Sequence, residues 1–187
     1  VSESIRGLLD AWATTPAYVQ GRRFDVLAAN RPATALTPMF TPGRNILREV
    51  FLNPAVRDQF PDWNERLPGL VAALRALAGP DVTDPALVDL VGELSVRSER
   101  FRQLWSRHEV RPQLGGGIHR IDHPQVGLLE LRHDKFTVAG GDGQMLVVYH
   151  AAPGSSSERA LALLATLGDG QRPDGPPVQR DTPSASR

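Results

Sequence analysis

Histidines are the residues of this sequence best suited to metal binding, and three of the five, His119, His123 and His133, lie close together. On a helix, two histidines four residues apart lie about 6 Å from each other and can share one metal ion. On a strand, the same spacing separates them by roughly 13 Å, which is too far for one ion. Pro124 follows His123 and favours a turn. The surrounding pattern is that of strands, so we interpret these histidines as structural and expect neither a metal site nor a cofactor.

Other motifs give no stronger indication of an enzyme. The sequence has no cysteine, which excludes disulfides, thiolate catalysis and cysteine-ligated zinc. It has no Gly-x-Ser-x-Gly motif of the kind that serine hydrolases use. Gly115-Gly116-Gly117 lacks the Lys and Ser/Thr of a phosphate-binding loop, and an expected strand follows it instead of a helix. We therefore expect that the chain is not an enzyme.

Composition and charge narrow the class of protein further. The 187 residues are 41% hydrophobic, which is enough for one packed domain. The 21 basic and 21 acidic residues give a formal net charge of zero, whereas nucleic-acid-binding domains usually carry a basic excess. There is no run of 18 apolar residues and no signal peptide. We expect a cytoplasmic protein that does not interact with membranes.

Five segments are predicted to form strands, in a group of two and a group of three: residues 17–20, 24–29, 116–122, 127–136 and 145–151. They are rich in β-branched and aromatic residues and are bounded by glycine-containing turns. Leu129 and Leu131 alternate with Glu130 and Arg132, as on a strand with one buried face. A helical region of roughly residues 45–108 separates the two groups.

Apolar residues at helical spacing predict the helices. The main stripes are Ile5, Leu8, Leu9 and Trp12; Leu67, Leu70, Val71, Leu74 and Leu77; Leu87, Val88, Val91 and Leu94; Phe101, Leu104, Trp105 and His108; and Leu161, Leu164 and Leu167. Pro68 is expected to kink or restart its helix. From residue 168 the chain is polar and rich in Pro, Gly and Ser, so the tail 168–187 is expected to be disordered.

Two hairpins separated by a helical block predict a five-stranded antiparallel sheet with helices covering one face. We therefore assign the chain to the α+β class. The arrangement is typical of a sensor domain like a PAS domain, spanning residues 1–167.

Several blocks of the sequence resemble a known family. They are TPAYVQGRRFDVLAAN (15–30), NILREVFLNP (45–54), FPDW (60–63), LWSRHEVR (104–111), RIDHPQVG (120–127), and LVVY with PG (146–149 and 153–154). In this order they resemble the ligand-binding domain of MmyB-like transcription regulators. The resemblance implies a PAS-like fold and a helix-turn-helix module of the Xre type that would precede Val1. It also implies a fatty-acid-like ligand between sheet and helices.

A ligand pocket is mostly apolar with a few polar anchors. The strands offer Tyr18, Val26, Leu129, Leu131, His133 and Val148 as candidate lining residues, and the helices offer Phe51, Trp63, Phe101, Trp105 and His108. For each of these residues, a place in the ordinary core is the alternative interpretation. Arg120 could pair with a ligand carboxylate through its guanidinium, or form a surface ion pair.

We predict an effector-sensing domain, in a homodimer, that binds a small apolar or amphipathic molecule and reaches DNA only through the upstream module. Two alternatives remain open. The domain could be a ligand-free dimerisation module. Residues 84–108 could instead form a helix-turn-helix in which Arg100, Arg102, Gln103 and Arg107 face DNA.

Overall fold

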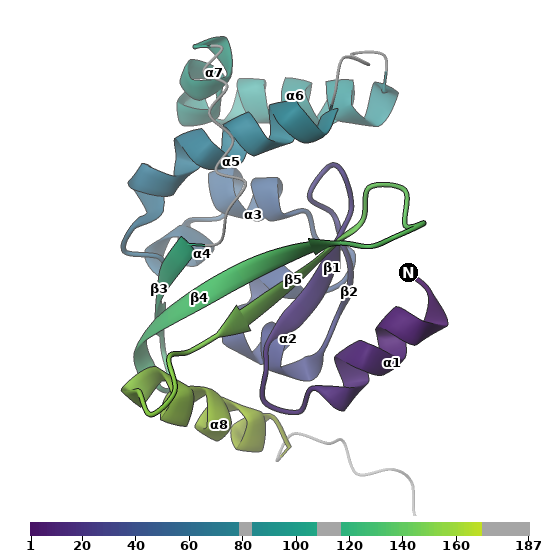
Figure 1. The fold of residues 1–187 in the computed structure, drawn as a ribbon. Helices are drawn as coiled ribbons and strands as arrows, with labels where there is room; N and C mark the ends of the chain where they lie inside the picture. The colour runs from purple at the N-terminus through teal and green to yellow at the C-terminus, as the bar shows by residue number, and fades with distance from the viewer. Residues whose placement is uncertain (79–83, 108–116, 170–187) are drawn as a thin grey trace, which may run out of the picture.

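The computed structural model describes residues 1–78, 84–107 and 117–169. Its centre is one antiparallel sheet in the order β2-β1-β5-β4-β3 (Figure 1). The strands are β1 (Ala17–Gln20), β2 (Val26–Ala29), β3 (Gly117–His123), β4 (Gly127–Thr137) and β5 (Met145–His150). The two hairpins join where β1 pairs with β5. The predicted α+β class and five-stranded antiparallel sheet are therefore confirmed.

Nine helical segments surround this sheet in the described part of the chain. They are α1 (Glu3–Ala11), α2 (Arg31–Leu36), the short 3₁₀ helix η1 (Pro38–Phe40), α3 (Ile46–Leu52), α4 (Pro54–Asp58), α5 (Trp63–Ala78), α6 (Pro85–Arg97), α7 (Glu99–Ser106) and α8 (Ser156–Asp169). None of these helices has the length and apolar character that would be needed to cross a bilayer.

Side-chain caps explain where several helices begin. The Asn45 side-chain oxygen accepts hydrogen bonds from the backbone amides of Leu47 and Arg48 at the start of α3. Ser98 does the same for the amide of Phe101 at the start of α7. Such caps satisfy amides that have no partner within the helix.

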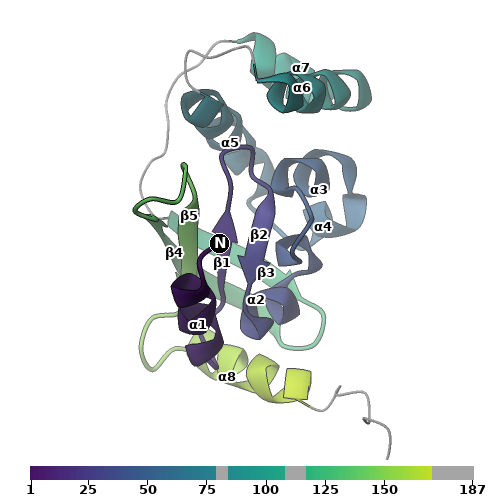
Figure 2. The ribbon, with the colours of Figure 1, turned by 90° about the vertical axis from the view of Figure 1, so that its right-hand side faces the viewer.

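Both faces of the sheet are covered in part, by different helices. The inner face packs against the helical block between the hairpins, through residues such as Tyr18 and Leu131. On the outer face, α1 lies beside the sheet (Figures 1 and 2), and its Leu9 packs with Val19 and Leu146. The expectation that helices cover one face was therefore incomplete. The reason is that every residue of β1 is buried, so this strand needs a covering layer on each side.

The helices also depart from the predicted pattern at four positions. Helix α5 continues through Pro68 and does not restart there. Proline removes one backbone hydrogen bond, and the packing of the buried face of α5, which includes Leu67, offsets this loss. Val88, Leu167 and Leu8 are 53%, 44% and 38% exposed, so including them in the apolar stripes was wrong. In α6 the buried stripe includes Leu90 instead, which is 2% exposed.

Candidate ligand-binding cavity

A cavity of about 720 Å³ lies between the inner face of the sheet and helix α5. The sheet forms its floor and α5 its roof, while η1, α3 and the loop before α5 close its sides. The residues on which the following description depends are Tyr18, Gln20, Phe40, Trp63, Arg66, Leu67, Leu70, His119, His133, Lys135 and Tyr149. More than half of the lining residues are apolar or aromatic. The polar ones come from the sheet and, as Asp62, Glu65 and Arg66, from the beginning of α5 and the residue before it.

Aromatic rings form much of the floor. The rings of Tyr18 and Phe40 are stacked, with centroids 4.4 Å apart and planes inclined by 21°. Tyr149 extends this group, with its ring centroid 5.4 Å from Phe40. Tyr18 and Tyr149 reach the same face because they lie on the adjacent strands β1 and β5, where their side chains both point toward the helical block. Burial raises the pKa of both phenols, so both remain neutral.

Two histidines continue the floor toward the edge strand β3. The rings of His119 and His133 lie 4.2 Å apart in an edge-to-face arrangement. The Tyr149 hydroxyl and His119 Nδ1 are 3.4 Å apart, at the long end of hydrogen-bond distance. Burial, and after it the charge of His133, lowers the pKa of His119 to about 2. Burial, and after it the charge of Lys135, lowers the pKa of His133 to about 4. At neutral pH both rings are therefore uncharged.

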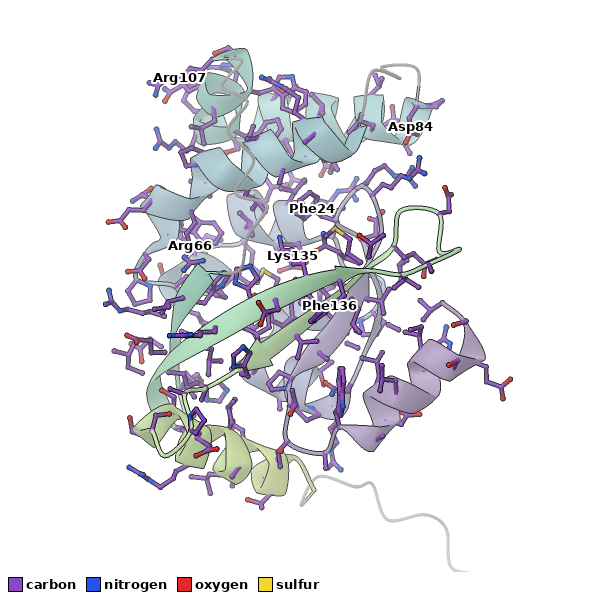
Figure 3. All side chains as sticks on the ribbon, viewed as in Figure 1. Phe24, Arg66, Asp84, Arg107, Lys135 and Phe136 are labelled. Atoms are coloured by element: carbon purple, nitrogen blue, oxygen red, sulfur yellow. The ribbon has the colours of Figure 1, made fainter. Side chains whose placement is uncertain are left out.

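Two cations also line the cavity, one from each side. Lys135 lies on the helix-facing side of β4, and Arg66 comes from α5 (Figure 3). Burial lowers the pKa of Lys135, and no carboxylate counteracts this effect. Burial also lowers the pKa of Arg66, but Asp62 and Glu65 are close enough to oppose the shift. Lys135 is therefore the less compensated of the two charges.

Gln20 contributes a polar group with no partner. Its side chain lines the cavity and is 1% exposed, and its Nε2 has no hydrogen-bond partner among the described residues. A buried amide that lacks a partner costs free energy, because it has lost its hydrogen bonds to water. The cavity thus combines an aromatic floor with two polar side chains, Gln20 and Lys135, for which the described residues supply no acceptor.

Three of the residues that the sequence suggested as pocket residues line this cavity. They are Tyr18, Trp63 and His133. Three others, Val26, Leu129 and Leu131, are fully buried on the same face of the sheet but within the packed core.

Three aromatic candidates lie together elsewhere. The ring of Phe101 meets Phe51 edge-to-face at 5.1 Å and stacks on Trp105 at 5.6 Å. The guanidinium of Arg75 lies over Trp105 and also donates a hydrogen bond to its backbone carbonyl. This cluster joins α3, α5 and α7 and does not line the cavity.

The remaining candidates lie outside the cavity or outside the described residues. Val148 packs with the cluster on the outer face of the sheet. Arg120 lies on β3 with half of its side chain exposed, 3.5 Å from Asp62 and 3.6 Å from Glu130. His108 lies outside the described residues.

The sequence did contain a signal for two of the residues that were missed. Lys135 has the same strand parity as Leu129, Leu131 and His133, and it is the only lysine in the chain. The same parity rule identifies Gln20 once Tyr18 is assigned to the inner face. Arg66 and Tyr149 needed the packing of α5 over the sheet, which no local pattern specifies.

The chemistry available in the cavity is that of binding. Within the described residues, no three His, Asp or Glu side chains are grouped so that they could hold a metal ion. The polar groups on the sheet side of the cavity are donors and neutral rings, which suit the recognition of a ligand with an acceptor group, whereas Asp62 and Glu65 line the cavity beside Arg66.

Comparison with known proteins agrees with this assignment. Residues 1–164 match the family model described as "MmyB-like transcription regulator ligand binding domain". No curated protein matches the chain.

Proposed function

The chain belongs to the family of MmyB-like transcription regulator ligand-binding domains, and from that premise we propose that the cavity under α5 binds a small apolar or amphipathic effector. The observation that carries this proposal is the space itself, about 720 Å³ within an otherwise packed core. Pockets for small ligands are typically about 300–1,000 Å³ and mostly apolar with a few polar groups. Protein interiors otherwise leave few voids larger than a water molecule.

The position of the cavity supports a sensing role. A ligand there would contact Tyr18 and Tyr149 on the sheet and Trp63 and Leu67 on α5 at the same time. A molecule that binds one arrangement of α5 more tightly than another would shift the equilibrium between them. We propose that this shift changes the placement of an Xre-type helix-turn-helix module upstream of Val1, in a cytoplasmic homodimer.

We further propose that the domain is PAS-like. The strand order β2-β1-β5-β4-β3, with the helices inserted between two hairpins, supports this assignment. The fatty-acid-like ligand that the family resemblance implies falls within the proposed class of amphipathic effectors. The proposal assigns no catalytic step to the domain.

The arrangement of α6 and α7 does not favour DNA binding by this part of the chain. Ser98 alone separates the two helices, whereas a helix-turn-helix has a turn of about 3–4 residues. Arg102 pairs with Glu99, and Gln103 donates a hydrogen bond to the same carboxylate. These polar groups of α7 are paired within the helix, which is typical of a solvated surface.

The proposal is tested by asking whether the purified domain carries a molecule that depends on this cavity. The protein is denatured, and released small molecules are identified by mass spectrometry. We expect a bound molecule in the unmodified domain and its loss in Ala73→Trp, which fills the cavity from α5. Ala76→Trp is the matched control, because Ala76 is exposed on the same helix.

Two results would count against the proposal. One is a stable dimer that releases nothing and binds no added amphiphile, which would favour the ligand-free dimerisation module. The other is an equal loss of the bound molecule in Ala73→Trp and Ala76→Trp, which would show that occupancy does not depend on the cavity.

A further inference from the structure

We propose that the effector is a planar aromatic acid, with its rings against the aromatic floor of the cavity and its carboxylate between Lys135 and Gln20. This inference rests on the proposed function, because it names the class of ligand for the same cavity. It is carried by two independent features, the pair of donors without acceptors and the concentration of aromatic side chains.

The acid group follows from the donors. Lys135 and Gln20 lie on the same face of the sheet, on β4 and β1, with β5 between them. Val147 of β5 is in register with both Lys135 and Tyr18, and Gln20 is two residues along from Tyr18. The long side chains of Lys135 and Gln20 can therefore converge over β5. A carboxylate would give the ammonium its missing counter-charge and the amide its missing acceptor.

Among the charged and titratable groups of the cavity, Lys135 is the one best suited to pair with a ligand carboxylate. Arg66 has Asp62 and Glu65 nearby, and their charges favour its protonated form. Burial of His119 and His133 lowers the pKa of each ring far enough to keep both neutral at pH 7. Neutral rings neither repel Lys135 nor bind the anion by charge. Lys135 is thus the cation that a buried anion would neutralise.

The aromatic body follows from the lining. The chain has six Phe, three Trp and two Tyr, and six of these eleven side chains line the cavity: Tyr18, Phe24, Phe40, Phe60, Trp63 and Tyr149. Tyr149 also stacks on His133, with ring centroids 5.6 Å apart and planes inclined by 26°. A planar aromatic ligand gains stacking and edge-to-face contacts with such walls, worth about 0.5–1.5 kcal/mol per ring pair beyond the burial of area. A saturated chain gains only the burial term.

Calorimetric titration of the full chain with three probes tests the inference. Naphthalene carboxylate carries both proposed features, naphthalene carboxamide has the same shape without charge, and laurate has the acid on a saturated chain. We expect the carboxylate to bind at least tenfold more tightly than the carboxamide and than laurate. Loss of a charge-assisted hydrogen bond of about 1.5–3 kcal/mol accounts for a factor of this size against the carboxamide. Against laurate, which keeps the carboxylate, the factor comes from the ring contacts that a saturated chain cannot make.

Three variants identify the group that recognises the anion. Lys135→Met is expected to weaken carboxylate binding about tenfold or more and to leave carboxamide binding nearly unchanged. Lys135→Arg keeps the charge and is expected to retain most of the affinity. Arg120→Gln is the matched control, because Arg120 is an exposed cation of the same sheet that lies outside the cavity. It is expected to change neither affinity.

Each contrary result has a distinct meaning. Tighter binding of laurate than of naphthalene carboxylate would overturn the aromatic acid and keep the proposed function. Equal carboxylate affinity in the unmodified chain and Lys135→Met would overturn the role of Lys135. Failure of all three probes to bind would overturn this inference. In that case, a molecule released from the purified domain would still support the proposed function, and an empty domain would remove both.

Discussion

Asn30 is predicted to be one of the costliest polar residues to replace in the domain. It is 4% exposed, and its side chain joins three segments. Its Oδ1 accepts hydrogen bonds from the amide of Ala17 at 2.9 Å and from that of Ala33 at 3.1 Å. Its Nδ2 donates to carbonyl groups at the end of α1 and beyond it, with Thr15 the closest at 2.7 Å. One amide group therefore holds the end of α1, the start of β1 and the start of α2 together.

The expected cost of Asn30→Ala can be built from these contacts. Loss of the N-cap of α2 costs about 1 kcal/mol. The amide of Ala17 is left buried without an acceptor, which costs about 1–3 kcal/mol. The carbonyl of Thr15 loses its hydrogen bond from Asn30 Nδ2. This loss adds about 1 kcal/mol to the cost, because a hydrogen bond from water compensates for only part of it. We expect the free energy of unfolding to fall by about 3–5 kcal/mol in total.

Urea unfolding followed by tryptophan fluorescence measures this loss, with Asn53→Ala as the matched control. Asn53 also caps a helix, α4, and accepts a hydrogen bond from the amide of Ala55 at 3.1 Å. It is only half-buried, and its Nδ2 donates a hydrogen bond to the Glu49 carboxylate four residues before it, so its replacement is expected to cost about 1 kcal/mol. If the two variants lost similar amounts of stability, the assignment of Asn30 as a junction would be refuted.

Three further outcomes are expected from the same unfolding assay. Phe101→Ala removes a fully buried ring and should cost about 3–5 kcal/mol without changing affinity for cavity ligands. The pKa of His133 is about 4 when folded, against 6.5 for the free side chain, so the unfolded chain binds more protons between these values. Stability should fall as pH drops from 6.5 toward 4, by on the order of 3 kcal/mol for His133 alone, with His119 adding to the slope. A flat pH profile would contradict the buried, neutral state of these rings. Gly127→Ala should destabilise by about 1 kcal/mol because φ is 75° there, whereas Gly92→Ala in open space within α6 should stabilise by about 0.5–1 kcal/mol. Equal effects at the two glycines would show that backbone conformation does not decide the outcome.

Rules that act within a few residues predicted most of the fold. Alternation on β4 identified Leu129 and Leu131 as buried, and both are 0% exposed. Asn45 caps a helix at the predicted beginning of the helical region, because capping needs only a side-chain oxygen and the next two or three amides. The strand order follows from two hairpins placed on either side of a helical block.

The second covered face of the sheet was not predicted, because the relevant signal is the lack of an exposed residue in β1. In β1, Ala17 and Val19 alternate with Tyr18 and Gln20, and all four are buried. A polar Gln in a strand normally lies on a solvated face, so residue type alone predicts Gln20 to be exposed, whereas it is buried on the cavity side. Only the docking of α1 against the opposite face establishes that both sides are covered.

Arg120 shows how residue type can mislead when register is unknown. An arginine near the end of a strand is a reasonable anion-binding candidate, since its guanidinium offers paired donors. In the structure it is in register with Glu130 on β4, and this places it beside that carboxylate. The register depends on the turn between β3 and β4, which the alternating pattern of either strand does not contain.

The presence of a lysine at position 135, in the lining of the cavity, is better explained by ligand binding than by the stability of the fold. An apolar residue there would extend the apolar face of β4 that Leu129 and Leu131 begin, and it would avoid the desolvation of an ammonium group. The lysine instead leaves a half-buried charge that makes no ion pair with the described residues, on the same face of the sheet as the Gln20 amide nitrogen, which also lacks a partner among them. Buried polar groups without partners are expected at functional sites, because the free-energy cost of their burial is offset only when a ligand is bound. Lys135 and Gln20 are both at least half-buried without acceptors among the described residues on the same face of the sheet, so one bound acceptor group would offset the desolvation costs of both.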